Sequence, residues 1–241
     1  MPSETYKYLA QVYEHLMSGI DYKIWSEYIK AICKDNKLKN PFVLELACGT
    51  GSIARELKRS FKKYFLSDLS HPMLKQLDDL KLPKVCCDMM LLPFNSVFDL
   101  VFSTFDSVNY LMTKEKFLKY LSEVSGILKP NGILTFDVSL ENNSIRYQKY
   151  LNRSGRTADV KYKQKSFYNR KTRIHYNYFD IILADGSKVE EIHKQRIYHF
   201  EEYFKFIEDS DFYVSNCYET FTFKDANAET ERAQFILKKK V

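Results

Sequence analysis

The sequence predicts an α/β protein in which a doubly wound sheet carries a small antiparallel β insertion. The first observation is a short apolar run, Phe42–Leu46, which is typical of a strand that helices cover on both faces. The second is the small-residue segment Ala47–Gly51 directly after it, which lets the backbone turn tightly and approach a ligand. The third is the alternating, aromatic-rich sequence between residues 157 and 200, which is typical of antiparallel strands.

Further strands follow the first one in the order expected of an α/β sheet. Lys63–Asp68 is a predicted strand that ends in an acid, and the predicted strand Lys84–Cys87 leads directly into Asp88. Phe98–Ser103 is the fourth predicted strand, and Leu128–Phe136 contains a helix end, a turn and the fifth. Because ligands of open α/β sheets bind beyond the carboxyl ends of the strands, these acids indicate a binding site at that edge.

The turn after the first strand fits two kinds of cofactor. Gly49–Ala54 satisfies the G-x-G-x-x-G/A pattern of dinucleotide-binding domains. Glu45, however, lies two residues before the turn, and its carboxylate would repel a pyrophosphate. The same carboxylate can accept hydrogen bonds from an ammonium group. Glu45 therefore favours a cofactor with a cationic amino-acid moiety over NAD.

The same segments resemble a known family. Residues 45–51, ELACGTG, resemble the acid-x-Gly-x-Gly-x-Gly motif of class I S-adenosylmethionine-dependent methyltransferases, with Ala47 in place of the first glycine. Residues 68–74, DLSHPML, are similar to the D-x-S-x-x-M-L segment of these enzymes. The resemblance covers residues 42–139. It implies a Rossmann-like, seven-stranded, doubly wound sheet whose last strand, Glu231–Lys239, is antiparallel.

The resemblance also implies the cofactor and its contacts. The cofactor is S-adenosyl-L-methionine and the product is S-adenosyl-L-homocysteine. By resemblance, Asp68 accepts the ribose hydroxyls, Asp88 receives the adenine amino group and Met73 packs on the adenine. The complete expected set of cofactor-binding residues is Tyr13, Tyr22, Trp25, Glu45, Ala47, Cys48, Gly49, Thr50, Gly51, Asp68, Leu69, Met73, Asp88, Met89 and Phe105.

The N-terminal residues 1–40 are expected to form a lid of two helices over the cofactor. Their aromatic pattern resembles the lid of small-molecule methyltransferases, including aminosugar N,N-dimethyltransferases. By that resemblance Tyr13, Tyr22 and Trp25 close over the methionine end of the cofactor. Residues 1–139 and 200–241 together would form the cofactor-binding domain.

Residues 140–199 are expected to form an antiparallel insertion that covers the substrate site. Three strands are predicted in and just after this segment, at Thr157–Tyr168, Lys171–Ala184 and Lys188–Phe200. Asp185-Gly186 indicates a type I′ hairpin between the last two.

Length, composition and charge restrict the class of protein. A chain of 241 residues that is 45% hydrophobic can bury a large core. It has no apolar run of twenty residues, and Met1–Gln11 is polar, so we expect a cytoplasmic protein without a membrane span. Five cysteines without a CxxC pair fit a reducing compartment and indicate no metal site. The formal charge of +6 is scattered, which is typical of a solvated surface and makes nucleic acid an unlikely partner.

The segment Thr104–Leu111 follows the fourth strand and is the predicted methyl-transfer site. The candidate bases are Asp106, Tyr110 and His199, of which histidine has the pKa best suited to neutral pH. The sequence thus predicts a methyltransferase, monomeric or homodimeric, that acts on a small molecule, with nitrogen as the favoured acceptor. Two alternatives stay open: an RNA (tRNA) methyltransferase, and a cofactor-binding module that no longer transfers methyl groups.

Overall fold

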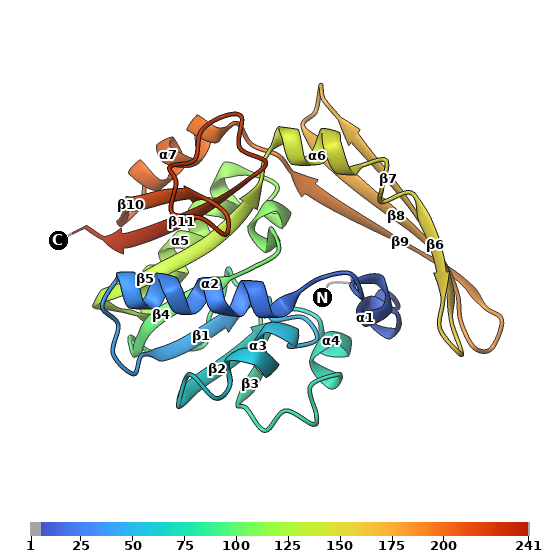
Figure 1. Cartoon of the computed structure of the whole chain (residues 1–241), viewed down its shortest axis with the longest axis horizontal. Helices are drawn as coiled ribbons and strands as arrows, with labels where there is room; N and C mark the ends of the chain where they lie inside the picture. The colour runs from blue at the N-terminus through green and yellow to red at the C-terminus, as the bar shows by residue number, and fades with distance from the viewer. Residues whose placement is uncertain (1–5, 241) are drawn as a thin grey trace.

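The computed structural model describes residues 6–240, which form two sheets side by side (Figure 1). The larger sheet has seven strands in the order β10-β11-β5-β4-β1-β2-β3. Its strands are β1 (Phe42–Leu46), β2 (Lys63–Asp68), β3 (Lys84–Cys86), β4 (Phe98–Ser103), β5 (Leu128–Ser139), β10 (Phe212–Glu219) and β11 (Arg232–Lys239). β11 is antiparallel to both of its neighbours, whereas the pairs from β5 to β3 are parallel. The doubly wound sheet with an antiparallel last strand is therefore confirmed.

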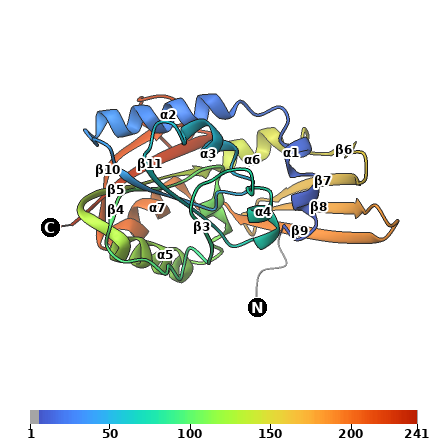
Figure 2. The ribbon, with the colours of Figure 1, turned by 90° about the horizontal axis from the view of Figure 1, so that it is seen from below.

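Helices cover both faces of this sheet, which explains why every residue of β1 except Glu45 is apolar. The helices are α2 (Tyr22–Asp35), α3 (Ser52–Leu57), α4 (His71–Lys75), α5 (Lys114–Ile127) and α7 (Phe200–Glu208). Figure 2 shows α2 and α3 on one side of the sheet and α5 on the other. Val43 belongs to the core on the α2 and α3 side, and its neighbour Leu44 belongs to the core on the α5 and α7 side. Successive residues of a strand point to opposite faces, so a doubly covered strand is apolar at both sets of positions rather than alternating.

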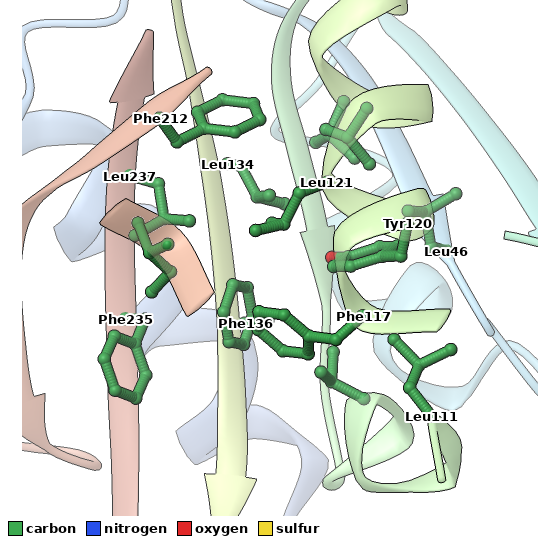
Figure 3. Close-up of a cluster of buried hydrophobic side chains, with 14 of the residues drawn as sticks. Leu46, Leu111, Phe117, Tyr120, Leu121, Leu134, Phe136, Phe212, Phe235 and Leu237 are labelled. Atoms are coloured by element: carbon green, nitrogen blue, oxygen red, sulfur yellow. The ribbon is translucent and has the colours of Figure 1, made fainter. Parts of the chain in front are cut away.

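The core beneath α5 combines aliphatic and aromatic side chains, and the aromatic rings of three elements contact one another (Figure 3). Phe117 of α5 lies edge-on to Phe136 of β5, with ring centroids 6.0 Å apart. Phe136 in turn stacks on Phe235 of β11 at 5.5 Å. All three side chains are fully buried, and each such burial stabilises the fold by about 1.5–3 kcal/mol. This core fixes β5 and β11, whose ends lie beside the candidate site.

The second sheet contains four strands, so the prediction of three was wrong. They are β6 (Arg153–Arg156), β7 (Lys161–Asn169), β8 (Ile174–Ile182) and β9 (Lys188–Arg196), and α6 (Glu141–Tyr147) precedes them. β6 has no apolar alternation that could have predicted it. Its Gly155 lies opposite Tyr162, and a Cβ at Gly155 would lie 2.5 Å from the Tyr162 hydroxyl. The absence of a side chain at Gly155 lets β6 pack closely on β7, and the sequence alone does not reveal this contact.

The hairpin at Asp185-Gly186 is present, but its turn is not type I′. Only Gly186 has a left-handed φ, +82°, whereas type I′ needs positive φ at both central residues. The Gly186 N–H donates to the Leu183 carbonyl at 3.0 Å, and the Leu183 N–H donates to the Ser187 carbonyl at 2.9 Å. The connection is therefore a three-residue loop with glycine in the left-handed position.

Of the two predicted lid helices, only α2 is a long helix. Its N-cap is Asp21, whose Oδ1 accepts the Lys23 N–H at 2.9 Å. The preceding segment forms two short pieces, η1 (Leu9–Gln11) and α1 (Tyr13–Leu16), while residues 1–5 of the predicted lid lie outside the described residues. Leu9 and Leu16 are buried against Phe179 and its neighbours in the second sheet. Tertiary packing onto that sheet, rather than helix periodicity, determines the shape of this segment.

Candidate active site

The loop between β1 and α3 is fixed by its backbone conformation and by an acid from β2. Ala47, Gly49 and Gly51 have left-handed φ values of +52°, +56° and +72°. The Asp68 carboxylate accepts the Gly49 N–H at 2.8 Å and the Ser70 N–H at 2.7 Å. Burial raises the pKa of Asp68, although these hydrogen bonds act in the opposite direction. A Cβ at Gly49 would meet no described atom within 4 Å, so the loop backbone faces open space there.

Glu45 is a buried carboxylate. Among residues 6–240, the one side chain that donates a hydrogen bond to it is a tyrosine. Its exposed fraction is 1%, and the Tyr64 hydroxyl donates to its Oε2. Burial raises the pKa of Glu45 to about 8, partly opposed by the Tyr64 hydrogen bond and reinforced by the charge of Asp68. A buried carboxylate is costly unless a partner compensates it. A cationic group of a bound ligand would supply that compensation.

These acids lie in one open pocket with about 1060 Å³ of empty space. The predicted residues on its wall are Tyr13, Tyr22, Glu45, Ala47, Cys48, Gly49, Thr50, Asp68, Leu69, Met73, Asp88, Met89, Phe105 and Tyr110. The sequence interpretation missed Tyr6, Ser52, Ile53, Ser67, Ser70 and Cys87, whereas Thr104 and Ser107 on the wall belong to the predicted methyl-transfer segment Thr104–Leu111. Every charged side chain on the described wall is a carboxylate, namely Glu45, Asp68 or Asp88. The pocket therefore favours a cationic ligand and disfavours phosphate groups.

The N-terminal segment lies along one side of the pocket and contacts the loop after β1. Glu14 of α1 accepts hydrogen bonds from the hydroxyls of Thr50 and Ser52, the latter at 2.9 Å. Tyr22 lies edge-on to Phe105, with ring centroids 5.8 Å apart. These contacts connect the N-terminal segment to the loop after β1 and to the segment after β4.

Two predicted cofactor-binding residues, Trp25 and Gly51, do not line the pocket. Trp25 is buried in the core. Its ring packs against Phe105, with the two ring centroids 4.6 Å apart. Gly51 is required for packing, because a Cβ there would lie 1.8 Å from Cδ2 of the buried Leu77. Both residues are in structural positions next to the pocket.

Two of the candidate bases also lie off the pocket wall. His199 is exposed, and its backbone N–H donates to Glu202 at 2.7 Å in the capping box of α7. Asp106 makes an ion pair with Arg232, with Oδ1 and Nη1 2.6 Å apart, and accepts a hydrogen bond from Gln195. Arg232 also pairs with Asp137, so Asp106 belongs to a cluster of ion pairs off the pocket wall. Tyr110 is the candidate that lines the pocket.

Tyr110 has polar partners that the sequence interpretation missed. Its hydroxyl lies 2.7 Å from the hydroxyl of Tyr6 and 3.0 Å from Nδ1 of His193. Nε2 of His193 lies 3.3 Å from Oε2 of Glu191. Glu191 and His193 are two residues apart on β9 and share one face of that strand. This spacing was visible in the sequence, but nothing there indicated that this face meets Tyr110.

The residues on the wall fit S-adenosylmethionine. The open space at Gly49 leaves room for the ligand backbone, and Glu45 offers a buried carboxylate to an ammonium group. The apolar side chains of Leu69, Met73 and Met89 offer a surface for adenine. The pocket lies at the carboxyl edge of a seven-stranded sheet whose last strand is antiparallel. This chain is a class I S-adenosylmethionine-dependent methyltransferase.

Comparisons with known proteins agree with that class. Residues 43–132 match the model of a methyltransferase domain. A solved S-adenosylmethionine-dependent methyltransferase from Clostridium acetobutylicum is 27% identical, with a TM-score of 0.80 over 98% of this chain and 99% of that one. A Bacillus subtilis protein provisionally named as the methyltransferase YqeM is 29% identical over 97% of both chains. The sugar N-methyltransferase KedS8 from Streptoalloteichus shares the fold, with 15% identity and a TM-score of 0.72 over 93% and 90% of the chains.

No helix among residues 6–240 is long and apolar enough to cross a membrane.

Proposed function

We propose that this methyltransferase transfers the methyl group to a nitrogen atom of a small molecule. The main support is the acceptor end of the pocket, which Tyr6, Tyr13 and Tyr110 line without a described lysine, arginine or histidine on the wall. A wall of phenols and carboxylates suits a neutral or cationic acceptor such as an amine. A large polyanion would find no charge partner there. KedS8, which shares the fold, is named as a sugar N-methyltransferase.

The cofactor contacts are part of this proposal. Glu45 binds the ammonium group, Asp68 the ribose hydroxyls and Asp88 the adenine amino group, while Met73 packs on the adenine. Oδ1 of Asp88 also accepts the Met90 N–H at 2.8 Å, which orients its carboxylate. When bound, S-adenosylmethionine supplies an electrophilic methyl group on a sulfonium that is a good leaving group.

The protein's contribution to the reaction is positioning and desolvation. The phenols of Tyr6, Tyr13 and Tyr110 would enclose the acceptor and hold its nitrogen in line with the methyl carbon. Alignment of this kind can lower a barrier by about 7–11 kcal/mol. The aromatic faces can also stabilise the positive charge that is shared along the reaction coordinate.

The first experiment measures cofactor choice by calorimetric titration of the purified protein with S-adenosylmethionine and with NAD. We expect binding of S-adenosylmethionine alone, because Glu45 faces an ammonium favourably and a pyrophosphate unfavourably. Binding of NAD alone would overturn the site assignment.

The second experiment identifies the acceptor class. The protein is incubated with S-adenosylmethionine labelled in its methyl group and with either a pool of small amines or total tRNA. We expect label in the amine pool and none with Asp68→Ala as the control. Salt-sensitive labelling of tRNA alone would instead indicate an RNA methyltransferase. Labelling of neither pool, with intact cofactor binding, would indicate a non-catalytic module.

A further inference from the structure

A line of hydrogen bonds leads from the acceptor end of the pocket into the β insertion. It runs from Tyr6 to Tyr110 at 2.7 Å, from Tyr110 to Nδ1 of His193 at 3.0 Å, and from Nε2 of His193 to Glu191 at 3.3 Å. Both tyrosines line the pocket, whereas His193 and Glu191 lie behind them with exposed fractions of 2% and 6%. The four side chains thus connect the pocket to a buried carboxylate.

The carboxylate fixes the direction of these hydrogen bonds. Ionised Glu191 can only accept, so Nε2 of His193 carries the hydrogen and Nδ1 is left as an acceptor. Tyr110 then donates to Nδ1, and Tyr6 donates to the Tyr110 oxygen. The same logic governs hydrolytic triads, in which a carboxylate orients a histidine that accepts a proton from a hydroxyl. Here a phenol occupies the place of the hydroxyl nucleophile.

Glu191 is held in its ionised form by the lid segment. Its carboxylate accepts the backbone N–H groups of Tyr6 and Leu9, each at 2.9 Å, and that of Tyr8. Burial acts to raise the pKa of Glu191, but the hydrogen bonds from His193, Tyr8 and Leu9 outweigh it and lower the pKa below its usual value. The same carboxylate therefore orients His193 and anchors the segment that carries Tyr6.

Among the described residues that contact His193, the charged one is Glu191. The ring of Tyr6 lies 4.4 Å away and that of Phe179 lies 5.4 Å away, measured between centroids, with Tyr110 at the Nδ1 side. Burial raises the pKa of both Tyr6 and Tyr110 above the usual value of a phenol, so neither ionises by itself near neutral pH. The imidazole of His193 is the remaining group of this line, and it joins the Tyr110 hydroxyl to the Glu191 carboxylate.

We propose that Tyr110, His193 and Glu191 form a proton relay that deprotonates the methyl acceptor. This inference rests on the proposed function and names its acceptor as one that must lose a proton before it attacks, such as an ammonium group. Tyr110 touches the acceptor, His193 receives the proton through Tyr110, and Glu191 positions His193. Tyr6 donates a hydrogen bond to the Tyr110 oxygen and holds it in place.

The transfer balances without a further reactant. The acceptor ammonium gives one proton to the Tyr110 oxygen while Tyr110 gives its own proton to Nδ1 of His193, which becomes an imidazolium paired with Glu191. The free nitrogen lone pair then forms the N–C bond as the S–C bond breaks and the electron pair of that bond stays on sulfur. His193 returns its proton to solvent after the product leaves.

The first test needs no acceptor. In full-length protein labelled with ¹⁵N-histidine and saturated with S-adenosylhomocysteine, we expect His193 to be the Nε2–H tautomer with an unprotonated Nδ1. Tyr110→Phe should shift the Nδ1 resonance, because it removes the hydrogen bond. The matched control is Tyr162→Phe, whose hydroxyl lies 3.1 Å from Nδ1 of a different histidine, His15. An Nδ1–H tautomer, or a resonance unchanged by Tyr110→Phe, would overturn the relay.

The second test uses the amine that the labelling experiment identifies. At pH 7, His193→Gln should lower kcat about 100-fold, the scale of general base catalysis, with cofactor affinity within about twofold of the unmodified protein. The loss should shrink as the pH rises, because the amine then loses its proton to solvent. Tyr110→Phe serves as a second variant and should show the same pH profile.

The matched control for the histidine variant is His175→Gln. His175 is buried on β8 between the hydroxyls of Ser144 and Ser166, at 2.9 and 2.6 Å, and contacts no residue of the relay. We expect its kcat to change little. A loss of kcat in His193→Gln that stays constant with pH would show that His193 has a structural role, and it would contradict the relay. If no amine is methylated, the proposed function fails while the tautomer test still decides the geometry of the relay.

Discussion

The cofactor half of the pocket and its acceptor end are built in different ways. The proposed cofactor half comes from the ends of the neighbouring strands β1, β2 and β3, and its geometry depends on local contacts such as the hydrogen bond between Asp68 and Gly49, 19 residues apart. At the acceptor end, Tyr110 is 104 residues from Tyr6 and 83 from His193. Local backbone contacts therefore fix the proposed cofactor site, whereas the proposed acceptor site depends on the packing of residues 6–16 against the second sheet.

Gly51→Ala should produce the largest effect, a loss of stability, since it distorts the loop on which the proposed cofactor half depends. A Cβ at a left-handed φ that also meets Leu77 should lower the free energy of unfolding by about 2–5 kcal/mol. Gly49→Ala is the matched control, because its Cβ would enter open space and cost only about 1–2 kcal/mol. Urea unfolding of the ligand-free variants measures both values. Equal costs would mean that packing against Leu77 contributes nothing.

Asp68→Ala should next weaken S-adenosylmethionine binding by about 10- to 100-fold, the range of one charged hydrogen bond. The variant loses the acceptor for Gly49 and Ser70 as well as the proposed ribose contact. Asp99→Ala is the control, because Asp99 of β4 also accepts a backbone N–H, from Phe42 at 2.8 Å, but lies near the amino ends of β1 and β4, away from the pocket. Calorimetric titration compares the two variants. Equal losses would contradict a local cofactor site at the carboxyl edge.

The buried carboxylate of Glu45 predicts a pH effect of intermediate size. Because its pKa in the folded protein is about 8, above the usual value of 4.5, the folded state holds a proton that the unfolded state releases. The stability of the ligand-free protein should fall as pH rises from about 5 to 8, and the affinity for S-adenosylmethionine should rise over the upper part of that range. Glu45→Gln should flatten both trends. Melting temperatures and titrations at pH 5, 6, 7 and 8 provide the test, and an unaltered slope in Glu45→Gln would refute it.

Glu14→Ala should have the smallest effect, because it removes a link between the two halves rather than either half. Glu14 accepts hydrogen bonds from Thr50 and Ser52 but is itself exposed. We expect S-adenosylmethionine affinity to fall about 2- to 10-fold, with faster release, since each such bond contributes about 0.5–1.5 kcal/mol. Glu27→Ala is the control, as Glu27 makes only a surface ion pair with Lys30. Equal release rates of S-adenosylmethionine from the two variants, measured by stopped flow, would show that the hydrogen bonds of Glu14 do not slow its release.

Three errors of the sequence interpretation concern contacts made across long chain distances. His199 was favoured for its chemistry, but it caps α7, whereas His193 reaches Tyr110. Asp106 is a predicted base, but it forms an ion pair with Arg232 of the last strand and lies off the pocket wall. Trp25 supports Phe105 from the core rather than from the pocket. In each case the residue type was plausible, and the partner was invisible in the local sequence.

The sequence by itself determined the sheet, the loop after β1 and the cofactor class. Strand periodicity, the left-handed glycines and acids at strand ends are local features, and backbone sterics and short-range hydrogen bonds turn them directly into geometry. Only the tertiary structure decided which residues face the acceptor. The positions of Tyr6, Tyr110 and His193 depend on the burial of Leu9 and Leu16 against the second sheet. Because hydrophobic burial is non-directional, a sequence pattern shows that these leucines are buried but not which surface buries them.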